Sequence, residues 1–153
     1  GIAISSAGEV TMAAQPSVGT FATAGQSNVT GNGASHTVLQ TEIWDINADF
    51  ASNTFTAPVT GKYMVASQVE WEGGGHNQSS LHLVASLRTW NTYSDFGDSS
   101  LQMTHHNVKV LDMDAGDTLV SQMYIGGIGA NTADINSGSV DDVRSGITIH
   151  LLG

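Results

Sequence analysis

The feature that most constrains this sequence is an alternation of apolar and polar side chains with a period of two, repeated in short runs along the chain. The clearest run, residues 62–71, reads KYMVASQVEW, and every second residue from Tyr63 to Trp71 is apolar except Ser67. A period of two places successive side chains on opposite faces of a β-strand. No window sustains the apolar period of an amphipathic helix over three turns. The sequence therefore predicts an all-β fold.

Further strand-like runs are separated by clusters of Gly, Asn, Asp and Ser, which are typical of turns. They lie at residues 17–24, 36–46, 53–57, 81–90, 101–110, 118–125 and 145–152. Short strands at this spacing predict a sandwich or barrel. The length of 153 residues fits a single domain. Within it, residues 1–35 are expected to supply edge strands and a loop, and residues 36–153 the core.

Charged side chains are sparse and mostly acidic. The chain has 4 Lys and Arg against 14 Asp and Glu, which gives a net charge of −10. Nucleic acid is not a predicted partner, because affinity for phosphates comes from clustered basic side chains. No run approaches 18 apolar residues, so no membrane insertion is predicted. The absence of Cys excludes disulfides and thiol catalysis.

One segment carries a specific local motif. Residues 55–63 read FTAPVTGKY, in which Phe55 and Tyr63 are predicted to face the core. Pro58 suits the end of a strand because it has no amide hydrogen, and Gly61 permits a turn conformation closed to residues with a Cβ. The segment resembles the signature of the complement C-one-q family, in which a strand ends in Phe-Thr-x-Pro-x-x-Gly-x-Tyr and the next strand begins at the Tyr.

Two further segments match the same family in order and spacing. MDAGDTL, with Gly116 and Asp117, resembles the family's Gly-Asp turn before a strand. RSGITIHLL resembles its closing strand, with Gly146 matching and Arg144 where an aromatic is usual. The resemblance runs from near residue 37 to the C-terminus. It implies a ten-strand jelly-roll sandwich, C-one-q-like and TNF-like, that assembles as a homotrimer around a threefold axis.

The segments TFTAPVTGKY and DMDAGD, in a chain rich in Asn, Thr and Gly, also resemble stand-alone domains of this type in bacteriophage structural proteins. That resemblance implies a non-enzymatic virion module: a tail-fibre or spike head, or a capsid decoration protein. Its partners would be its own copies, other virion proteins, or a cell-surface receptor or glycan. The alternative is a secreted lectin-like or cytokine-like ligand-binding domain. The expected location is accordingly the virion surface or the extracellular space.

No motif in the sequence supports catalysis. It has no G-x-S-x-G elbow, no Walker loop and no H-E-x-x-H. We therefore predict that the chain is not an enzyme and requires no cofactor, with calcium as a candidate ion.

Two acidic groups are candidate calcium sites, because Ca²⁺ prefers oxygen ligands. The first group consists of Asp112, Asp114 and Asp117. The competing interpretation there is an ordinary turn, in which the Asp after Gly bonds to its own backbone. The second group, in the loop before the last strand, consists of Asp134, Asp141 and Asp142. Three copies of this loop in a trimer would gather acidic groups if the loop lies near the axis.

His105 and His106 are adjacent, so they are predicted to point to opposite sides of a strand and to chelate poorly within one chain. One of them meeting its copies at a threefold axis would form a three-imidazole site for a transition metal. The competing interpretation is a packed or solvent-facing His.

Trp71, Glu72 and His76 flank a Gly-rich segment and are candidate carbohydrate-binding residues. The competing interpretation places the aromatic residue in the core or an interface. An aromatic sheet face is also a candidate subunit interface. Its residues are Trp71, Trp90, Tyr93, Phe96 and Tyr124.

Overall fold

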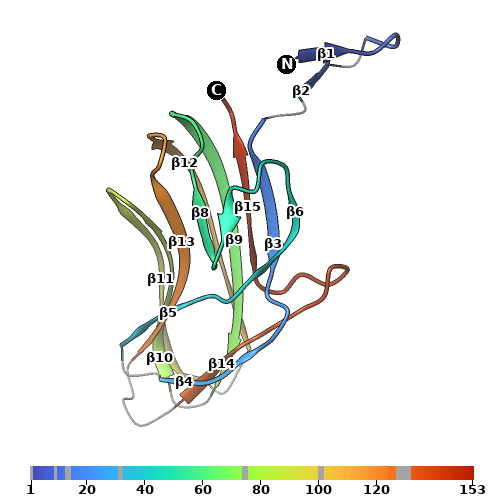
Figure 1. Cartoon of the computed structure of the whole chain (residues 1–153). Helices are drawn as coiled ribbons and strands as arrows, with labels where there is room; N and C mark the ends of the chain where they lie inside the picture. The colour runs from blue at the N-terminus through green and yellow to red at the C-terminus, as the bar shows by residue number, and fades with distance from the viewer. Residues whose placement is uncertain are drawn as a thin grey trace.

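The computed structural model describes residues 2–8, 10–12, 15–30, 33–73, 76–99, 102–126 and 132–153. They form fifteen strands, arranged mainly as two antiparallel sheets that face each other across the core (Figure 1). The all-β prediction is confirmed. Within these ranges, no helix has the length and apolar character that a membrane span requires.

Sheet I contains the strand with the clearest alternation, β9 (Gly61–Glu72). Its strand order is β4 (Gln26–Thr30), β14 (Thr132–Ile135), β9, β15 (Gly146–Leu151), β3 (Ser17–Phe21) and β6 (Thr41–Asp45). A seventh strand, β12 (Met103–Met113), pairs with β9 along nearly its whole length.

Sheet II covers the other side of the core. Its strand order is β11 (Thr89–Ser99), β10 (His76–Ala85), β13 (Thr118–Gly126), β8 (Thr54–Thr56) and β7 (Phe50–Ala51), and β5 (Ser35–Thr37) also pairs with β13. The remaining strands, β1 (Ile2–Ile4) and β2 (Val10–Met12), pair with each other in a hairpin that projects from the sandwich in Figure 1.

The alternation of β9 has the predicted orientation. Tyr63, Val65, Val69 and Trp71 are fully buried and point toward sheet II. Ser67, the polar exception on this face, is also buried, and its hydroxyl lies 3.1 Å from that of Ser121 on β13. This hydrogen bond joins the two sheets and satisfies both buried hydroxyls, which explains why a polar residue is tolerated in the core.

The FTAPVTGKY motif joins the sheets at one end of the sandwich. The rings of Phe55 and Tyr63 meet edge to face with centroids 5.5 Å apart, and both residues are fully buried. The Tyr63 hydroxyl donates a 2.7 Å hydrogen bond to the Val59 carbonyl, which holds the intervening turn against β9. Burial is the main reason that the pKa of Tyr63 is raised.

The reason for the glycine in this motif differs from the prediction. Gly61 is the first residue of β9 and does not have a positive φ. A Cβ at this position would instead lie 2.7 Å from Leu151 Cδ1 and 3.2 Å from the Gly153 carbonyl oxygen. Close packing against the C-terminal strand therefore requires Gly61, whereas the turn conformation reserved for glycine is found at Gly116, with φ of 92°.

Two strand predictions and one loop prediction need correction. The run predicted at 36–46 is divided into β5 and β6, which belong to different sheets. The run predicted at 81–90 crosses the turn between β10 and β11, where Ala85 and Arg88 exchange backbone hydrogen bonds. That turn contains Ser86, a weak turn signal, but none of the Gly, Pro, Asn or Asp residues that signal a turn more strongly. The predicted loop at 25–35 contains β4.

The structure also places part of the N-terminal segment differently. Residues 1–35 were expected to form edge strands, but β3 lies inside sheet I between β15 and β6. The interior position of β3 agrees with the burial of Val18, Thr20 and Phe21. An edge strand would leave one row of backbone groups unpaired.

Candidate functional site

The outer face of sheet I carries an apolar surface. Val108 and Val110 on β12 are 60% and 58% exposed, and they pair directly with Ala66 and Met64 on β9. Residues that pair directly across two strands share one face of the sheet, so the four side chains are contiguous. A contiguous exposed apolar patch, unlike scattered single residues, is typical of an interaction surface.

Trp44, on β6, extends this surface along the same face of the sheet. Its ring lies directly on Gly19, where an added Cβ would overlap the ring atoms. The indole Nε1 donates a 3.0 Å hydrogen bond to Ser17 Oγ, which also lies 2.9 Å from His150 Nδ1. These contacts hold the indole in place on the sheet.

A groove of about 430 Å³ runs between Trp44 and Val108. Its other lining residues include Ile43, Ala66, Val140 and Val143. We call this groove, together with Met64 and Val110, the sheet I face. Its lining combines these apolar side chains with uncharged polar ones from Thr20, Ser67, Gln68 and Thr148, and with His106.

The aromatic residues proposed for a subunit interface do not form one common face. Trp71 is in the core and Trp90 packs partly buried against it, whereas Tyr93 and Tyr124 lie together on sheet II. The side chain of Phe96 lies outside the described residues. Sequence reasoning missed Val108 and Val110, although β12 carries a signal for them.

That signal is an inverted alternation. Around the middle of β12, the polar residues His105 and Asn107 point into the sandwich, while Val108 and Val110 point outward. A strand with solvent on its outer face would normally show the opposite pattern. Buried polar residues and exposed valines are the pattern expected of a strand whose outer face contacts another molecule.

The adjacent histidines point to opposite sides of β12, as predicted. His105 is buried and its Nε2 lies 2.6 Å from Ser79 Oγ on β10. His106 is exposed on the sheet I face, opposite Gln68. Of the two, only His106 can meet a copy of itself in an assembly through this face.

Beside His106 lies a charged cluster centred on Glu70. Its Oε1 accepts hydrogen bonds from Gln102 at 2.9 Å and Asn136 at 3.2 Å, and it forms a 3.3 Å ion pair with Arg144. Arg144 also contacts Asp142 at 3.2 Å. Thus Arg144, which stands where the resembling family has an aromatic, links the loop before β15 to β9.

The predicted carbohydrate-binding group needs correction. Trp71 and His76 are fully buried, with ring centroids 5.8 Å apart in an edge-to-face contact. Only Glu72 of the three is exposed. A sugar ring cannot stack on either aromatic group, so the competing interpretation of a core aromatic holds for Trp71.

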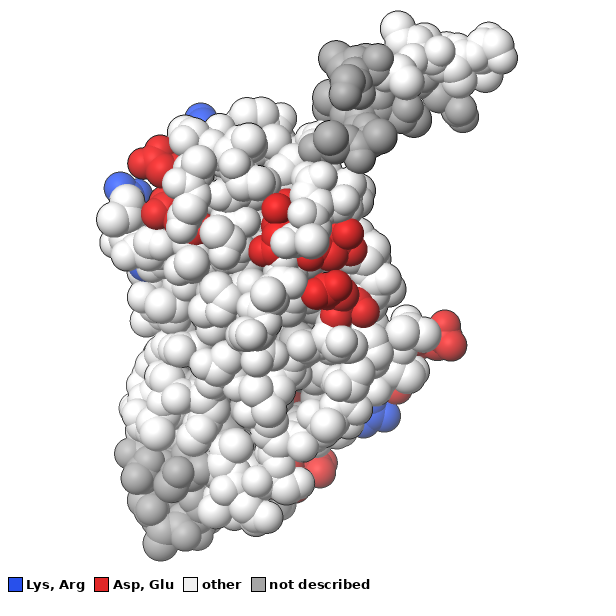
Figure 2. Space-filling model, in the orientation of Figure 1, with Lys and Arg blue, Asp and Glu red and all other residues white. Residues whose placement is uncertain are grey.

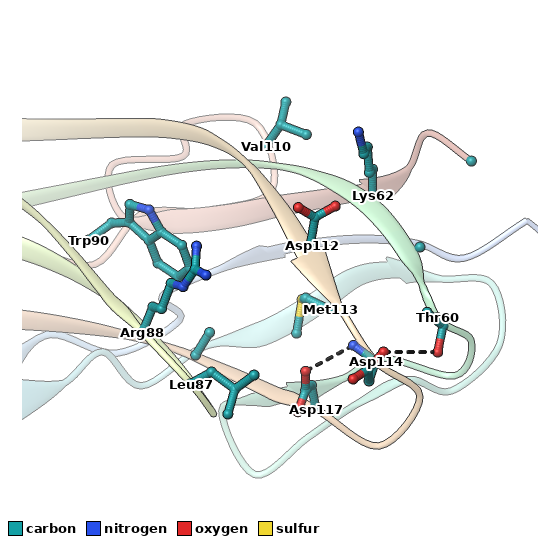
Figure 3. A pocket seen from close by; sticks show the side chains of 13 residues that line it. Thr60, Lys62, Leu87, Arg88, Trp90, Val110, Asp112, Met113, Asp114 and Asp117 are labelled. Carbon is teal, nitrogen blue, oxygen red and sulfur yellow. Dashed lines mark hydrogen bonds between the residues drawn. The ribbon is translucent and has the colours of Figure 1, made fainter.

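The first acidic group borders a groove of about 560 Å³ at the end of the sandwich. Figure 3 shows Asp114 and Asp117 together at the turn, with Asp112 farther along β12 near Lys62. The Asp114 amide donates a 2.9 Å hydrogen bond to Asp117 Oδ2, and Thr60 donates a 3.4 Å hydrogen bond to Asp114 Oδ1. The carboxylates of Asp114 and Asp117 therefore stabilise the turn through hydrogen bonds, as the competing interpretation expected.

The second acidic group is dispersed. Asp134 Oδ1 accepts a 2.7 Å hydrogen bond from the Asn28 backbone amide, whereas Asp142 pairs with Arg144 and Asp141 is exposed in the turn between Ser139 and Asp142. In the described part of the chain, no three His, Asp or Glu side chains are placed to hold a metal ion together. Figure 2 likewise shows acidic side chains in separate groups on a largely uncharged surface. A single chain therefore offers calcium no ready site among these residues.

Burial gives His105 a testable role in stability. Its interior position, reinforced by the neighbouring His106, lowers the pKa of His105. The unfolded chain therefore binds a proton at a higher pH than the folded chain does. The stabilising contribution is complete above the ordinary histidine pKa of about 6.5 and is lost progressively as the pH falls below it.

We therefore expect the melting temperature to fall between neutral pH and pH of about 5, and His105→Gln to flatten this dependence. Thermal unfolding followed by circular dichroism across this range measures it. His106→Gln is the matched control and should keep most of the pH dependence. Burial also lowers the pKa of His82, so His82 makes a contribution of the same sign to the pH dependence of the wild type and of both variants. An unchanged pH profile in His105→Gln would contradict the prediction.

Comparisons with known proteins agree on the fold. No protein-family model matches the sequence, and no curated protein matches it with significant similarity. Among solved structures, the chain is similar to the globular domain of zebrafish complement 1qA protein, with 17% identity and a TM-score of 0.64, covering 91% of this chain and 98% of that one. It is also similar to murine APRIL, with 10% identity and a TM-score of 0.61, covering 90% and 99%.

A third similar structure is Eiger TNF from S. frugiperda, with 15% identity and a TM-score of 0.60, covering 91% of this chain and 94% of that one. At these identities the likeness establishes the fold. The predicted jelly roll of the C-one-q and TNF type is confirmed.

Proposed function

We propose that the chain is a non-enzymatic binding module that assembles as a homotrimer through the sheet I face. The observation that carries this proposal is the exposed apolar surface around Val108 and Val110, with the inverted alternation of β12 behind it. The resemblance to the C-one-q family, together with the jelly-roll fold, supports three copies as the assembly. Burying the valines would remove from water the largest exposed aliphatic side chains of β12.

The chemistry of the face suits contact between copies of one chain. In the middle of the face, Ala66, Val108 and Thr148 are uncharged, so copies carrying a net charge of −10 each can approach there without direct repulsion. The charged residues Glu70, Asp142 and Arg144 lie at its border and satisfy one another within the chain. Interfaces commonly have this arrangement of apolar centre and polar rim.

Two settings for the trimer follow from the resemblances. We favour a virion surface or structural module, such as a tail-fibre head or a capsid decoration protein, with other virion proteins or a host receptor as partners. The alternative is a secreted ligand-binding domain. Co-sedimentation of the chain with assembled virus particles supports the first setting. Recovery of the chain only from the fraction without virus particles supports the second.

Light scattering coupled to size exclusion tests the assembly. We expect a mass about three times the chain mass of 15.9 kDa, both with and without a metal chelator. A trimer that the chelator dissociates would instead make His106, or the acidic loop of Asp141 and Asp142, a metal site between copies. A stable monomer in both conditions would overturn the proposal.

A further inference from the structure

The outer face of sheet II, opposite the sheet I face, carries a group of three exposed or half-exposed rings that the proposed assembly does not use. Tyr93 on β11 and Tyr124 on β13 both pair with Ser80 on β10, so the two tyrosines flank Ser80 in one row of the sheet. His82 lies two residues further along β10, in the next row of the same face. We call Tyr93, Tyr124 and His82 the aromatic platform.

The rings of the platform contact one another. The centroids of Tyr93 and Tyr124 are 6.1 Å apart with an angle of 33° between the ring planes. His82 stacks on Tyr124 at 5.9 Å and 18°. The three rings therefore form one contiguous aromatic group on this face of the sheet.

The platform is fixed from below. Ser80 is fully buried beneath the rings, and its Oγ is hydrogen-bonded to His82 Nε2. The Tyr124 hydroxyl donates a 3.4 Å hydrogen bond to Gln78 Oε1 and lies within 3.3 Å of where a Cβ at Gly33 would be. Tyr93, by contrast, remains 52% exposed. The surface is thus held in place while its outermost ring is accessible.

Neutral hydrogen-bonding groups surround the rings. Gln78 lies in the row on one side of the tyrosines, and Asn91 and Gln122 flank His82 in the row on the other side. In these three rows of described residues, Asp95, opposite Gln78, is the one Asp, Glu, Lys or Arg. Burial lowers the pKa of His82, so its ring is neutral at neutral pH.

This combination fits a saccharide better than other ligand classes. A sugar ring offers one face of C–H groups, which an aromatic surface can cover, and a rim of hydroxyls, which amide and carboxylate groups can bind. The described residues of these three rows include no Lys or Arg for a phosphate or a nucleic acid. They also include no exposed aliphatic side chain of the kind that a large protein interface would bury.

We propose that the aromatic platform binds a neutral saccharide, with the sugar ring lying on Tyr93 and Tyr124 and its hydroxyls bound by Gln78, Asp95 and Gln122. An uncharged ligand matches a patch whose described residues carry one formal charge, the Asp95 carboxylate at the edge. The proposal gives a ligand class to the binding module of the previous subsection. Because the platform lies on the sheet opposite the sheet I face, trimer formation would leave it open.

Saturation-transfer NMR on the full chain tests the proposal with a defined panel of lactose, cellotetraose, maltotetraose and N,N′,N″,N‴-tetraacetylchitotetraose, each at millimolar concentration. We expect at least one of these saccharides to receive saturation from the protein, with the strongest transfer to protons on one face of a sugar ring. Transfer to none of the four would overturn the proposal.

Variants locate the site for the saccharide that binds. Tyr93→Ala should weaken its affinity at least about tenfold, as measured by titration, because the exposed ring supplies much of the stacking surface. Tyr93→Phe keeps the ring and should retain most of the affinity. Leu87→Ala, an exposed aliphatic site in the β10–β11 turn, is the matched control and should bind as the wild type does. Wild-type affinity in Tyr93→Ala would overturn the proposal.

The same samples separate this proposal from the trimer. Light scattering on the wild type and on Tyr93→Ala reports assembly independently of the sugar. A trimer that binds none of the four saccharides would overturn the saccharide site alone. A monomer whose saccharide binding depends on Tyr93 would overturn the assembly alone.

Discussion

Replacing Phe55 by Ala is expected to lower the free energy of unfolding by about 3 to 5 kcal/mol, since the removed ring leaves a cavity that a packed core fills only in part. Phe55 is fully buried in the main core cluster. It pairs with Phe50 on β7 and Leu119 on β13, and its ring contacts Tyr63 across the sandwich.

Urea unfolding followed by tryptophan fluorescence measures this loss. The wild type and the variant must be compared at the same chain concentration, because assembly adds to apparent stability. Val59→Ala is the control: Val59 belongs to the same motif but is 44% exposed, so its substitution should change stability far less. If Phe55→Ala unfolded like the wild type, the placement of β8 in the core would be wrong.

The second large effect concerns assembly. Val108→Asp is expected to convert the trimer into a monomer, with an approximately threefold fall in solution mass. Val108 lies at the centre of the sheet I face, where assembly would bury the new carboxylate without a basic partner. Burying an unpaired charge costs several kcal/mol per site, and a threefold assembly would contain three such sites. The chain already carries a net charge of −10, which adds repulsion.

Light scattering over a range of chain concentrations measures this effect. Leu87→Asp is the matched control, because Leu87 is an even more exposed aliphatic residue, 78% exposed, that lies outside the sheet I face. It should remain trimeric. Val108 is exposed in the single chain, so the far-ultraviolet circular dichroism of Val108→Asp should match that of the wild type. A trimeric Val108→Asp would exclude the sheet I face as the interface.

Local patterns were sufficient for much of the fold. The two-residue period of β9 predicted its buried face residue by residue, including the buried position of Ser67. The FTAPVTGKY motif located Phe55 and Tyr63 in the core before any tertiary contact was known. In both cases the determining interactions are local: strand pleating alternates side chains, and a short turn sets where the next strand begins.

Local patterns failed where strand boundaries and faces depend on distant partners. The turn after Ala85 has Ser86 as its one turn-typical residue, which is a weak signal, so pairing between β10 and β11 determines its position. Likewise, His76 follows a Gly-rich segment and carries no local signal of burial, and only the tertiary structure packs it against Trp71 in the core. The acidic turn is a case of the opposite kind, since its hydrogen bond from the Asp114 amide to Asp117 spans three residues and could be foreseen.

The sequence by itself thus determined the all-β class, the main core strands and the sparsely charged surface of this protein, because these follow from side-chain period and composition. Only the tertiary structure decided which surfaces are available for binding. Alternation defines two faces for β12 but not which one is buried. In the folded chain the middle of the inward face is polar, and His105 there is hydrogen-bonded to Ser79 on β10. This orientation of β12 leaves Val108 exposed. Sheet pairing in turn brings together Tyr93 and Tyr124, which are far apart in sequence, on either side of Ser80.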